Sequence, residues 1–281
     1  MDDDAFVRYV GARLGALPGV EAVSLGGSRA EGTHRTDSDW DFSIYYRGHF
    51  DPQSLRDIGW PGTVGDLGSW SSVPDTVFNG GAWLEIEGRA SDVHYRDLDV
   101  VDRVIASARE GRFATEPLWF HLAGFPSYAV MAELAANRVL VGRLPDVVYP
   151  AALRKRAPEV WWEQAQAEFH YARSYHATAG RLTQCIGLLA RAATCSAHAV
   201  LAAEGVWVTN EKRLFERAGL GEIDQILATV ANDPVALTDV VDRVRGTCAE
   251  AVRAARSRSS ASRGVRSPLA WGADTGLAPF D

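Results

Sequence analysis

The chain has 281 residues, of which 47% are hydrophobic, and a formal net charge of −7 at pH 7. This length predicts one large domain or two modest ones, with ample apolar residues for a packed core. The acidic balance argues against broad binding to DNA or RNA, because such binding depends on Lys and Arg that neutralise phosphates.

The cysteines and the N-terminal residues indicate the cellular compartment in which the protein is expected. Cys185, Cys195 and Cys248 are odd in number and have no C-x-x-C spacing, which is typical of buried thiols in a reducing compartment. The acidic start, Met-Asp-Asp-Asp, lacks the basic-then-apolar pattern of a signal peptide. No apolar run approaches the roughly 20 residues that span a bilayer. The sequence therefore predicts a cytoplasmic protein with no membrane partner.

The first elements alternate between helix and strand. Residues 3–16 have apolar side chains at helical spacing, and residues 20–25 form an apolar run that predicts a buried strand. Gly26-Gly27-Ser28 breaks this strand, and residues 27–32 are expected to form the first turn of a short helix. A second apolar run, residues 42–46, predicts the next strand.

Two carboxylates, Asp39 and Asp41, precede the second strand. Alternate residues of a strand point to one face, so the two side chains are expected to aim together. Their repulsion requires a cation, and carboxylates suit Mg²⁺, which keeps sites for waters and substrate phosphates. The Gly26-Gly27-Ser28 turn offers bare amides and a hydroxyl to an anion. A metal pair beside a phosphate cradle predicts a nucleoside triphosphate site.

The order of these features resembles a known family. The chain has Gly27-Ser28, then ten intervening residues, then Asp39-x-Asp41 followed by apolar residues. This pattern is similar to the signature of the DNA polymerase β-like nucleotidyltransferase superfamily. That superfamily needs a third carboxylate on a later strand, and Asp92 is a fitting candidate. The resemblance implies two Mg²⁺ ions between the three carboxylates, with ATP or another nucleoside triphosphate as co-substrate.

The resemblance also implies roles for the neighbouring residues. Gly26, Gly27 and Ser28 would grip the triphosphate, and Asp92 would be the general base for an acceptor hydroxyl. Arg29, beside Ser28, is open to two interpretations, as a phosphate contact or as a surface arginine. The product would be a nucleoside monophosphate ester of the acceptor, most simply an AMP ester, with release of pyrophosphate.

The middle of the chain continues with loops and strands. Residues 59–81 are rich in Gly, Pro, Ser and Trp, and this loop either borders an acceptor pocket or is pinned by its tryptophans. Residues 83–87 and 90–95 predict strands, and residues 97–109 predict a helix. Glu85 and Glu87 share a strand face and either approach the metals or are solvated, and solvated side chains are expected. His94 shares the face of Asp92 and either forms a hydrogen bond near the site or is structural, and a structural role is expected. Asp51-Pro52 is expected to open a short helix.

From about residue 116 strand signals thin out and helical periodicity takes over. We expect an edge strand at 139–141 and the following helices: 127–136, 150–178, 181–204, 210–218, 221–230 and 234–255. The fold class is therefore predicted as an α/β (α+β) nucleotidyltransferase domain with a mixed sheet, followed by an all-α helical-bundle domain. The predicted parts are a catalytic domain (1–145), a helical substrate-closing domain (146–255) and a flexible tail (256–281).

This arrangement resembles antibiotic, aminoglycoside-type nucleotidyltransferases such as the kanamycin and streptomycin adenylyltransferases. In that group a helical domain closes the substrate cleft, and in the streptomycin-type enzymes a lysine at a comparable helix start looks to contact the triphosphate. Lys212, one of only two lysines in the chain, is the matching candidate, or it is a solvated lysine. The resemblance implies a small-molecule acceptor such as an aminoglycoside, and it leaves a homodimer open because related enzymes include dimers.

Other functions stay open at this point. Minimal nucleotidyltransferase antitoxins transfer AMP to a partner HEPN toxin, which would make the acceptor a protein, although this chain has its own helical half. Arg191 and His198 fit the loose Arg-x(4–6)-His pattern of HEPN ribonucleases and share a helix face, although such short patterns often arise by chance. A non-catalytic nucleotide-binding module is the third alternative, and nothing in the carboxylate set supports a loss of catalysis.

Overall fold

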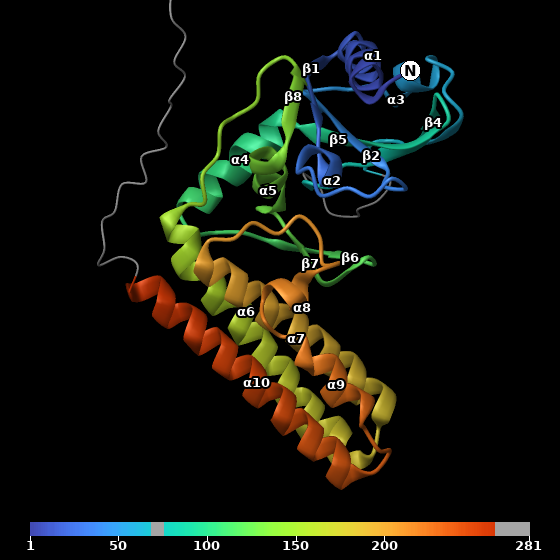
Figure 1. The fold of residues 1–281 in the computed structure, drawn as a ribbon. Helices are drawn as coiled ribbons and strands as arrows, with labels where there is room; N and C mark the ends of the chain where they lie inside the picture. Colours follow the sequence, from blue (N-terminus) through green and yellow to red (C-terminus); the bar gives the residue numbers. More distant parts are fainter. Residues whose placement is uncertain (69–75, 262–281) are drawn as a thin grey trace, which may run out of the picture.

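A six-stranded mixed sheet forms the N-terminal half of the molecule (Figure 1). The computed structural model describes residues 1–68 and 76–261. The sheet order is β3-β4-β5-β2-β1-β8, and within the described chain only the central β2–β5 pair is parallel. The strands are β1 (Val20–Leu25), β2 (Trp40–Tyr46), β3 (Gly62–Val64), β4 (Gly81–Ile86), β5 (Arg89–Asp97) and β8 (Arg138–Val141). The predicted edge strand at 139–141 is confirmed as β8.

Local capping explains where the first helices begin. Asp2 accepts a hydrogen bond from the Ala5 amide at the start of α1 (Asp3–Gly15), and α1 buries Phe6, Val7, Val10 and Leu14 against the sheet. Asp51 accepts from the Gln53 amide and starts α3 (Pro52–Arg56), as expected from Asp51-Pro52. Asp97 likewise caps α4 (Leu98–Arg109) by accepting from the Asp99 amide. These side chains satisfy amides that a helix start leaves without partners.

A small hairpin and a helix lie on the face of the sheet opposite α1. Strands β6 (Thr115–Leu118) and β7 (His121–Pro126) form a separate two-stranded sheet, and α5 (Ala129–Ala136) follows. The fully buried Arg96 of β5 makes a two-pronged ion pair with Glu133 of α5, at 2.8 Å for each contact. Because removal of either partner would leave an unpaired buried charge, this pair ties α5 to the centre of the sheet.

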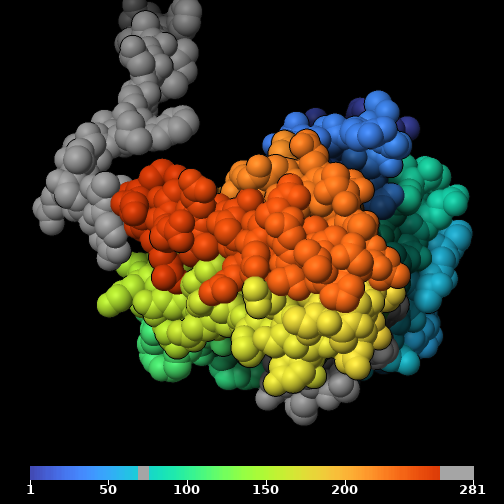
Figure 2. Space-filling model, turned by 90° about the horizontal axis from the view of Figure 1, so that it is seen from below, coloured from blue at the N-terminus to red at the C-terminus, as the bar shows by residue number. Residues whose placement is uncertain are grey.

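The C-terminal half is an elongated bundle of long helices (Figure 1). Its elements are α6 (Ala151–Tyr171), a π-helical turn (Ala172–His176), a 3-10 turn (Ala177–Ala179), α7 (Leu182–Glu204), α8 (Leu214–Arg217), α9 (Glu222–Ala228) and α10 (Pro234–Ala261). Figure 2, seen from below, shows α10 and its neighbours covering this end of the molecule. The structure therefore confirms the predicted fold class: a domain with a mixed sheet followed by a helical region.

Helix α7 is the centre of this bundle and packs against α6 and α10. Within the described chain it is the one helix long and apolar enough to cross a membrane, with a mean hydropathy of 1.5 in its most apolar window. That window is 72% buried inside the molecule, as expected for the core helix of a soluble protein. All three cysteines are free and buried, two of them on α7.

Several predicted elements differ from the observed ones. The β6–β7 hairpin falls where strand signals looked weak, because Pro117 interrupts β6, and a strand at the edge of a two-stranded sheet tolerates a proline. The helix predicted over 210–218 is wrong, since only Leu214–Arg217 is helical. The helix predicted to reach 178 changes to a π-helical turn at Ala172.

The far end of the chain also differs from expectation. Helix α10 continues to Ala261, so the first residues assigned to a tail at 256 are helical. Residues 262–281 lie outside the described part of the chain. Part of the predicted loop, residues 69–75, lies outside it too.

Candidate functional site

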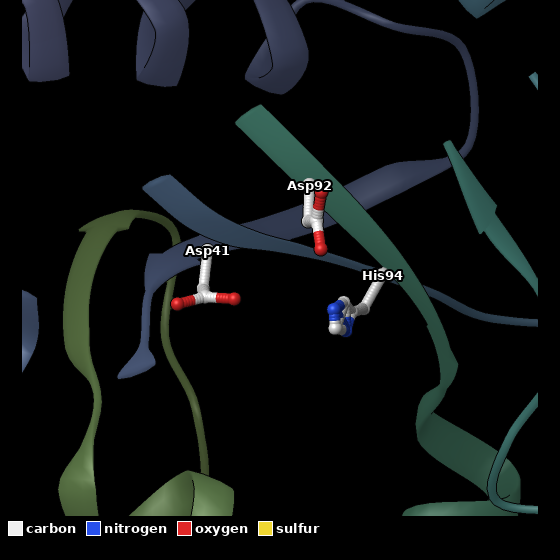
Figure 3. Close-up of side chains that lie close together, drawn as sticks. All are labelled: Asp41, Asp92 and His94. Carbon is white, nitrogen blue, oxygen red and sulfur yellow. The ribbon is translucent and has the colours of Figure 1, made fainter. Parts of the chain in front are cut away.

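Three side chains converge on the face of the sheet that looks toward the hairpin. Asp41 of β2 and Asp92 and His94 of β5 each place a ligand atom within 4.8 Å of the others (Figure 3). Asp41 lies opposite Asp92 in the parallel β2–β5 register, which puts the two carboxylates side by side on adjacent strands. His94 joins them because residues two apart on a strand share a face.

The carboxylates of this cluster hold their protons unusually well. Burial, as the larger cause, and the charge of Asp39 together raise the pKa of Asp41 to about 6. Burial and the charges of Asp41 and Asp39 raise the pKa of Asp92 to about 6 as well. Two half-buried carboxylates with these pKa values are costly to ionise together, so a cation between them would be bound strongly.

The imidazole of His94 is kept neutral in this environment. Burial, assisted by the positive charge of Arg96, lowers its pKa to about 4. A neutral imidazole has a lone pair on one ring nitrogen, so His94 can accept a hydrogen bond or ligate a metal at physiological pH. The sequence placed His94 on the face of Asp92 and favoured a structural role over a hydrogen bond near the site, and the structure brings it to the rim of the acidic pair.

The glycine turn after β1 lies directly against Asp41. The Gly26 amide donates to the Asp41 carbonyl at 2.7 Å. Gly27 has a left-handed φ of +61°, and a Cβ there would lie 1.9 Å from Asp41 Oδ2. Gly27 begins the four-residue α2 (Gly27–Ala30), which also contains Ser28. The turn and the carboxylate are thus in contact, as a phosphate cradle beside a metal would require.

Asp39 and Arg29 lie beside the cluster rather than in it. Asp39 is exposed, precedes β2 and is outside the three-residue group, but its charge acts on both clustered carboxylates. Arg29 donates from Nη2 and Nε to the Ser38 carbonyl, at 2.7 and 3.1 Å, and from Nε to the Asp39 carbonyl at 3.3 Å. Its guanidinium also lies 4.0 Å from the centre of the Trp40 ring. Arg29 therefore holds the backbone that carries Asp39.

A loop from the helical half reaches this site. Lys212 is exposed, and its charge lowers the pKa of both Asp41 and Asp92, which places it near the acidic pair. It lies in the turn before α8, where Asn210 accepts a hydrogen bond from the Lys212 amide at 3.1 Å. This turn is the stretch that was expected to be helical.

Glu211, beside Lys212, fastens this loop to strand β7. Its carboxylate accepts from the Leu122 amide at 2.7 Å and from the Ala123 amide at 3.3 Å. His198 Nε2 lies 3.2 Å from the same carboxylate. Burial would raise the pKa of Glu211, but the hydrogen bonds from His198 and from the Leu122 amide outweigh burial and keep that pKa below its usual value. We call this set of contacts the Glu211 clamp.

The Glu211 clamp was missed from the sequence because its partners are far apart along the chain. The sequence singled out His198 only as half of a ribonuclease pattern with Arg191. In the structure His198 is 2% exposed and stacks on Trp161, with ring centroids 4.7 Å apart. Arg191 instead forms an ion pair with the largely buried carboxylate of Glu168 at 3.1 Å. The two residues have separate partners, so no shared site supports the ribonuclease alternative.

Removal of the clamp is expected to free one strand of the hairpin. Glu211→Ala should lower the hydrogen-exchange protection of the Leu122 and Ala123 amides by at least about tenfold, because both lose a charged acceptor and a hydrogen bond to a charged group contributes about 1.5–3 kcal/mol. Glu216→Ala is the matched control, since Glu216 is exposed and pairs with Arg213. Unchanged protection at both amides in Glu211→Ala would contradict the clamp.

Comparison with known proteins gives one family match. A family model for the nucleotidyltransferase domain matches residues 7–72, which include β1, the glycine turn and Asp41. A solved structure of a nucleotidyltransferase-like protein from Exiguobacterium sibiricum aligns with 96% of this chain and 83% of that chain, at 9% identity and a TM-score of 0.44. No curated protein matched the chain. By the family match, the chain carries a nucleotidyltransferase domain and is an enzyme of the nucleotidyltransferase class.

Proposed function

We propose that this protein transfers a nucleoside monophosphate, AMP from ATP, to a hydroxyl group of a small-molecule acceptor and releases pyrophosphate. The observation that carries this proposal is the register of β2 and β5, which sets Asp41 against Asp92 beside a glycine turn that touches Asp41. Carboxylates of this kind and a cradle for phosphate are what a metal-bound triphosphate needs.

The residues present fit Mg²⁺. We propose that two ions bind between these carboxylates. Asp41 and Asp92 would hold the metal from adjacent strands, and Asp39 would add a carboxylate from the exposed side. Bound Mg²⁺ supplies charge neutralisation at the α-phosphate and at the departing pyrophosphate. Imidazole is not a ligand that Mg²⁺ favours, but neutral His94 could accept a hydrogen bond from a metal-bound water without adding positive charge beside the cation.

The protein groups would carry the remaining parts of the reaction. The amides around Gly26 and Gly27 and the Ser28 hydroxyl would bind the triphosphate, and Lys212 would offset its charge. The acceptor oxygen forms a bond to the α-phosphorus as the bond between that phosphorus and the bridging oxygen breaks. The electron pair leaves with pyrophosphate, and the hydroxyl proton passes to Asp92. The pKa of Asp92 is about 6 in the metal-free chain, and bound Mg²⁺ would lower it, so Asp92 would be ionised and able to accept this proton at neutral pH.

The helical half is proposed to close the cleft through the loop that carries Lys212. Support comes from the Glu211 clamp, which anchors this loop to β7 next to the site. The division into parts at residues 145 and 255 stays a proposal. The cytoplasmic location stays a proposal too. The exclusion of nucleic acid as acceptor is also a proposal, and the acidic net charge supports it. A homodimer also remains a proposal.

The test is calorimetric titration of ATP in the presence and absence of Mg²⁺, followed by titration of Mg²⁺ alone at two pH values. Binding of ATP should require Mg²⁺. At pH 6 each clustered carboxylate is about half protonated, so Mg²⁺ should release up to about one proton, and at pH 8 almost none. Proton release follows from heats measured in buffers of different ionisation enthalpy. A chain that binds no nucleoside triphosphate under these conditions would refute the proposed function.

A further inference from the structure

A cavity of about 300 Å³ opens beside Asp92 on the side away from Asp41. It lies between strands β4 and β5 and the turn of the β6–β7 hairpin. Most of its lining is apolar, and four aromatic side chains dominate it. The described residues that line it are Phe78, Gly80, Gly81, Ala82, Trp83, Asp92, Val93, His94, Trp119 and Phe120. Its size is at the lower end of the roughly 300–1,000 Å³ range of small-molecule sites.

The sheet order places this cavity opposite the phosphate cradle. The cradle follows β1 and touches Asp41 on β2, Asp92 lies on the next strand, β5, and Trp83 lies on β4 beyond it. Trp83 is paired with Asp92 in the β4–β5 register. In a phosphoryl-group transfer the attacking and leaving oxygens are roughly in line. If pyrophosphate leaves on the side of the cradle, the acceptor must approach from the side of this cavity.

The aromatic rim of the cavity is unusually exposed. Trp119 is 84% exposed and Phe120 is 41% exposed, and the two rings make an edge contact with centroids 5.1 Å apart. Phe120 also packs against Phe78, at 5.4 Å between centroids. Neighbouring exposed aromatic rings at a cavity mouth are typical of a binding surface for an apolar group.

The charges around the cavity select against a polycationic acceptor. Asp92 is the one charged side chain in the described lining, and it already serves the proposed metal and proton transfer. His94 adds no negative charge. An aminoglycoside has several ammonium groups, each of which needs a carboxylate or an open solvent path on binding. Aromatic faces instead bind flat, apolar groups by stacking and by removing their surface from water.

We propose that this cavity is the acceptor subsite and that it takes an uncharged aromatic group that bears the reacting hydroxyl. The ring would lie among Phe78, Trp83 and Phe120, with its hydroxyl directed at Asp92. This inference rests on the proposed function and specifies its acceptor: an aryl alcohol rather than an aminoglycoside.

The experiment uses the full chain saturated with Mg²⁺ and α,β-methylene-ATP, which resists transfer. Neutral aryl alcohols from benzyl alcohol to 2-naphthylethanol, and kanamycin as the polycation, are titrated by calorimetry. We expect at least one aryl alcohol to bind, kanamycin not to bind, and Phe120→Ala to weaken the aryl alcohol at least tenfold. Tyr175→Ala, a comparably exposed aromatic residue of the helical half, is the matched control and should change nothing.

The outcomes separate this inference from the proposed function. If the native chain does not bind α,β-methylene-ATP with Mg²⁺, the proposed function fails. If the nucleotide binds but no aryl alcohol does, or kanamycin binds instead, the acceptor inference alone is overturned. The same holds if Phe120→Ala weakens the nucleotide and not the aryl alcohol, because the cavity would then hold the nucleobase.

Discussion

Asp41→Asn is expected to abolish Mg²⁺-dependent ATP binding, with a loss of at least about 100-fold in affinity. Asp41 touches the glycine turn and also lies opposite Asp92, so it belongs to both the phosphate and the metal side of the site. An amide keeps the shape of the side chain but supplies no negative charge for Mg²⁺. Calorimetry with ATP and Mg²⁺ measures the loss directly, and affinity equal to that of the native chain would contradict the role given to Asp41.

The same substitution is expected to stabilise the metal-free fold. The pKa of Asp41 is raised from 3.8 to about 6, so the folded chain holds this proton more tightly than the unfolded chain. The ionised carboxylate therefore destabilises the folded chain. This destabilisation grows as pH rises from about 4 to about 6 and is fully present above pH 6. Asn removes this cost, which we place at about 1–2 kcal/mol after allowance for partial exposure.

Thermal unfolding without metal tests this opposite effect on stability. At pH 8 Asp41→Asn should raise Tm by about 2–6 °C, and the gain should disappear near pH 4, where the native carboxyl is protonated too. Asp57→Asn is the matched control, because Asp57 is exposed at the end of α3 and its side chain accepts a hydrogen bond from Gln53. A variant that loses ATP binding because it is poorly folded would show a lower Tm instead.

The central strands could be predicted because their signals are local. The run at 20–25 matches β1 residue for residue, and the Gly26-Gly27-Ser28 break stands where β1 ends. The choice of Asp92 followed from placing it on a later strand, and the parallel register then sets it opposite Asp41. Asp39 shows the limit of the period-two argument. It lies before β2 begins, so the alternation of side chains does not extend to it.

The features that were missed depend on contacts between distant residues. Glu211 accepts hydrogen bonds from the amides of residues 122 and 123. Neither segment has a sequence pattern that predicts its contact with the other. For His94, the spacing from Asp92 predicted the shared strand face, but it could not predict the burial and the charge of Arg96 that lower the pKa of His94. The aromatic cavity likewise needs Phe78 and Phe120 to meet across about 40 residues of chain, which hydrophobic periodicity does not encode.

Gly27→Ala is expected to remove nucleotide binding while leaving the fold intact. Its Cβ would lie 1.9 Å from Asp41 Oδ2 and 2.7 Å from Asp41 Cγ, so the carboxylate must move. A displacement of about 1 Å at a reacting centre can lower a rate about 100-fold, and a loss of that order in Mg²⁺-dependent ATP affinity is expected here. The left-handed φ adds a stability cost of about 1–2 kcal/mol, which thermal unfolding would report.

Gly32→Ala separates the two causes. Gly32 has a similar φ of +69°, but nothing lies within 4 Å of a Cβ built there. Both variants share the backbone strain, so both should lose stability, with Gly27→Ala losing more because of its contact with Asp41, and only Gly27→Ala should lose ATP affinity. If both lost affinity equally, the conformation of the whole loop, rather than contact between Gly27 and Asp41, would be what nucleotide binding requires. If neither did, the turn would not be the cradle, and the triphosphate would have to be held from the Lys212 side of the cleft.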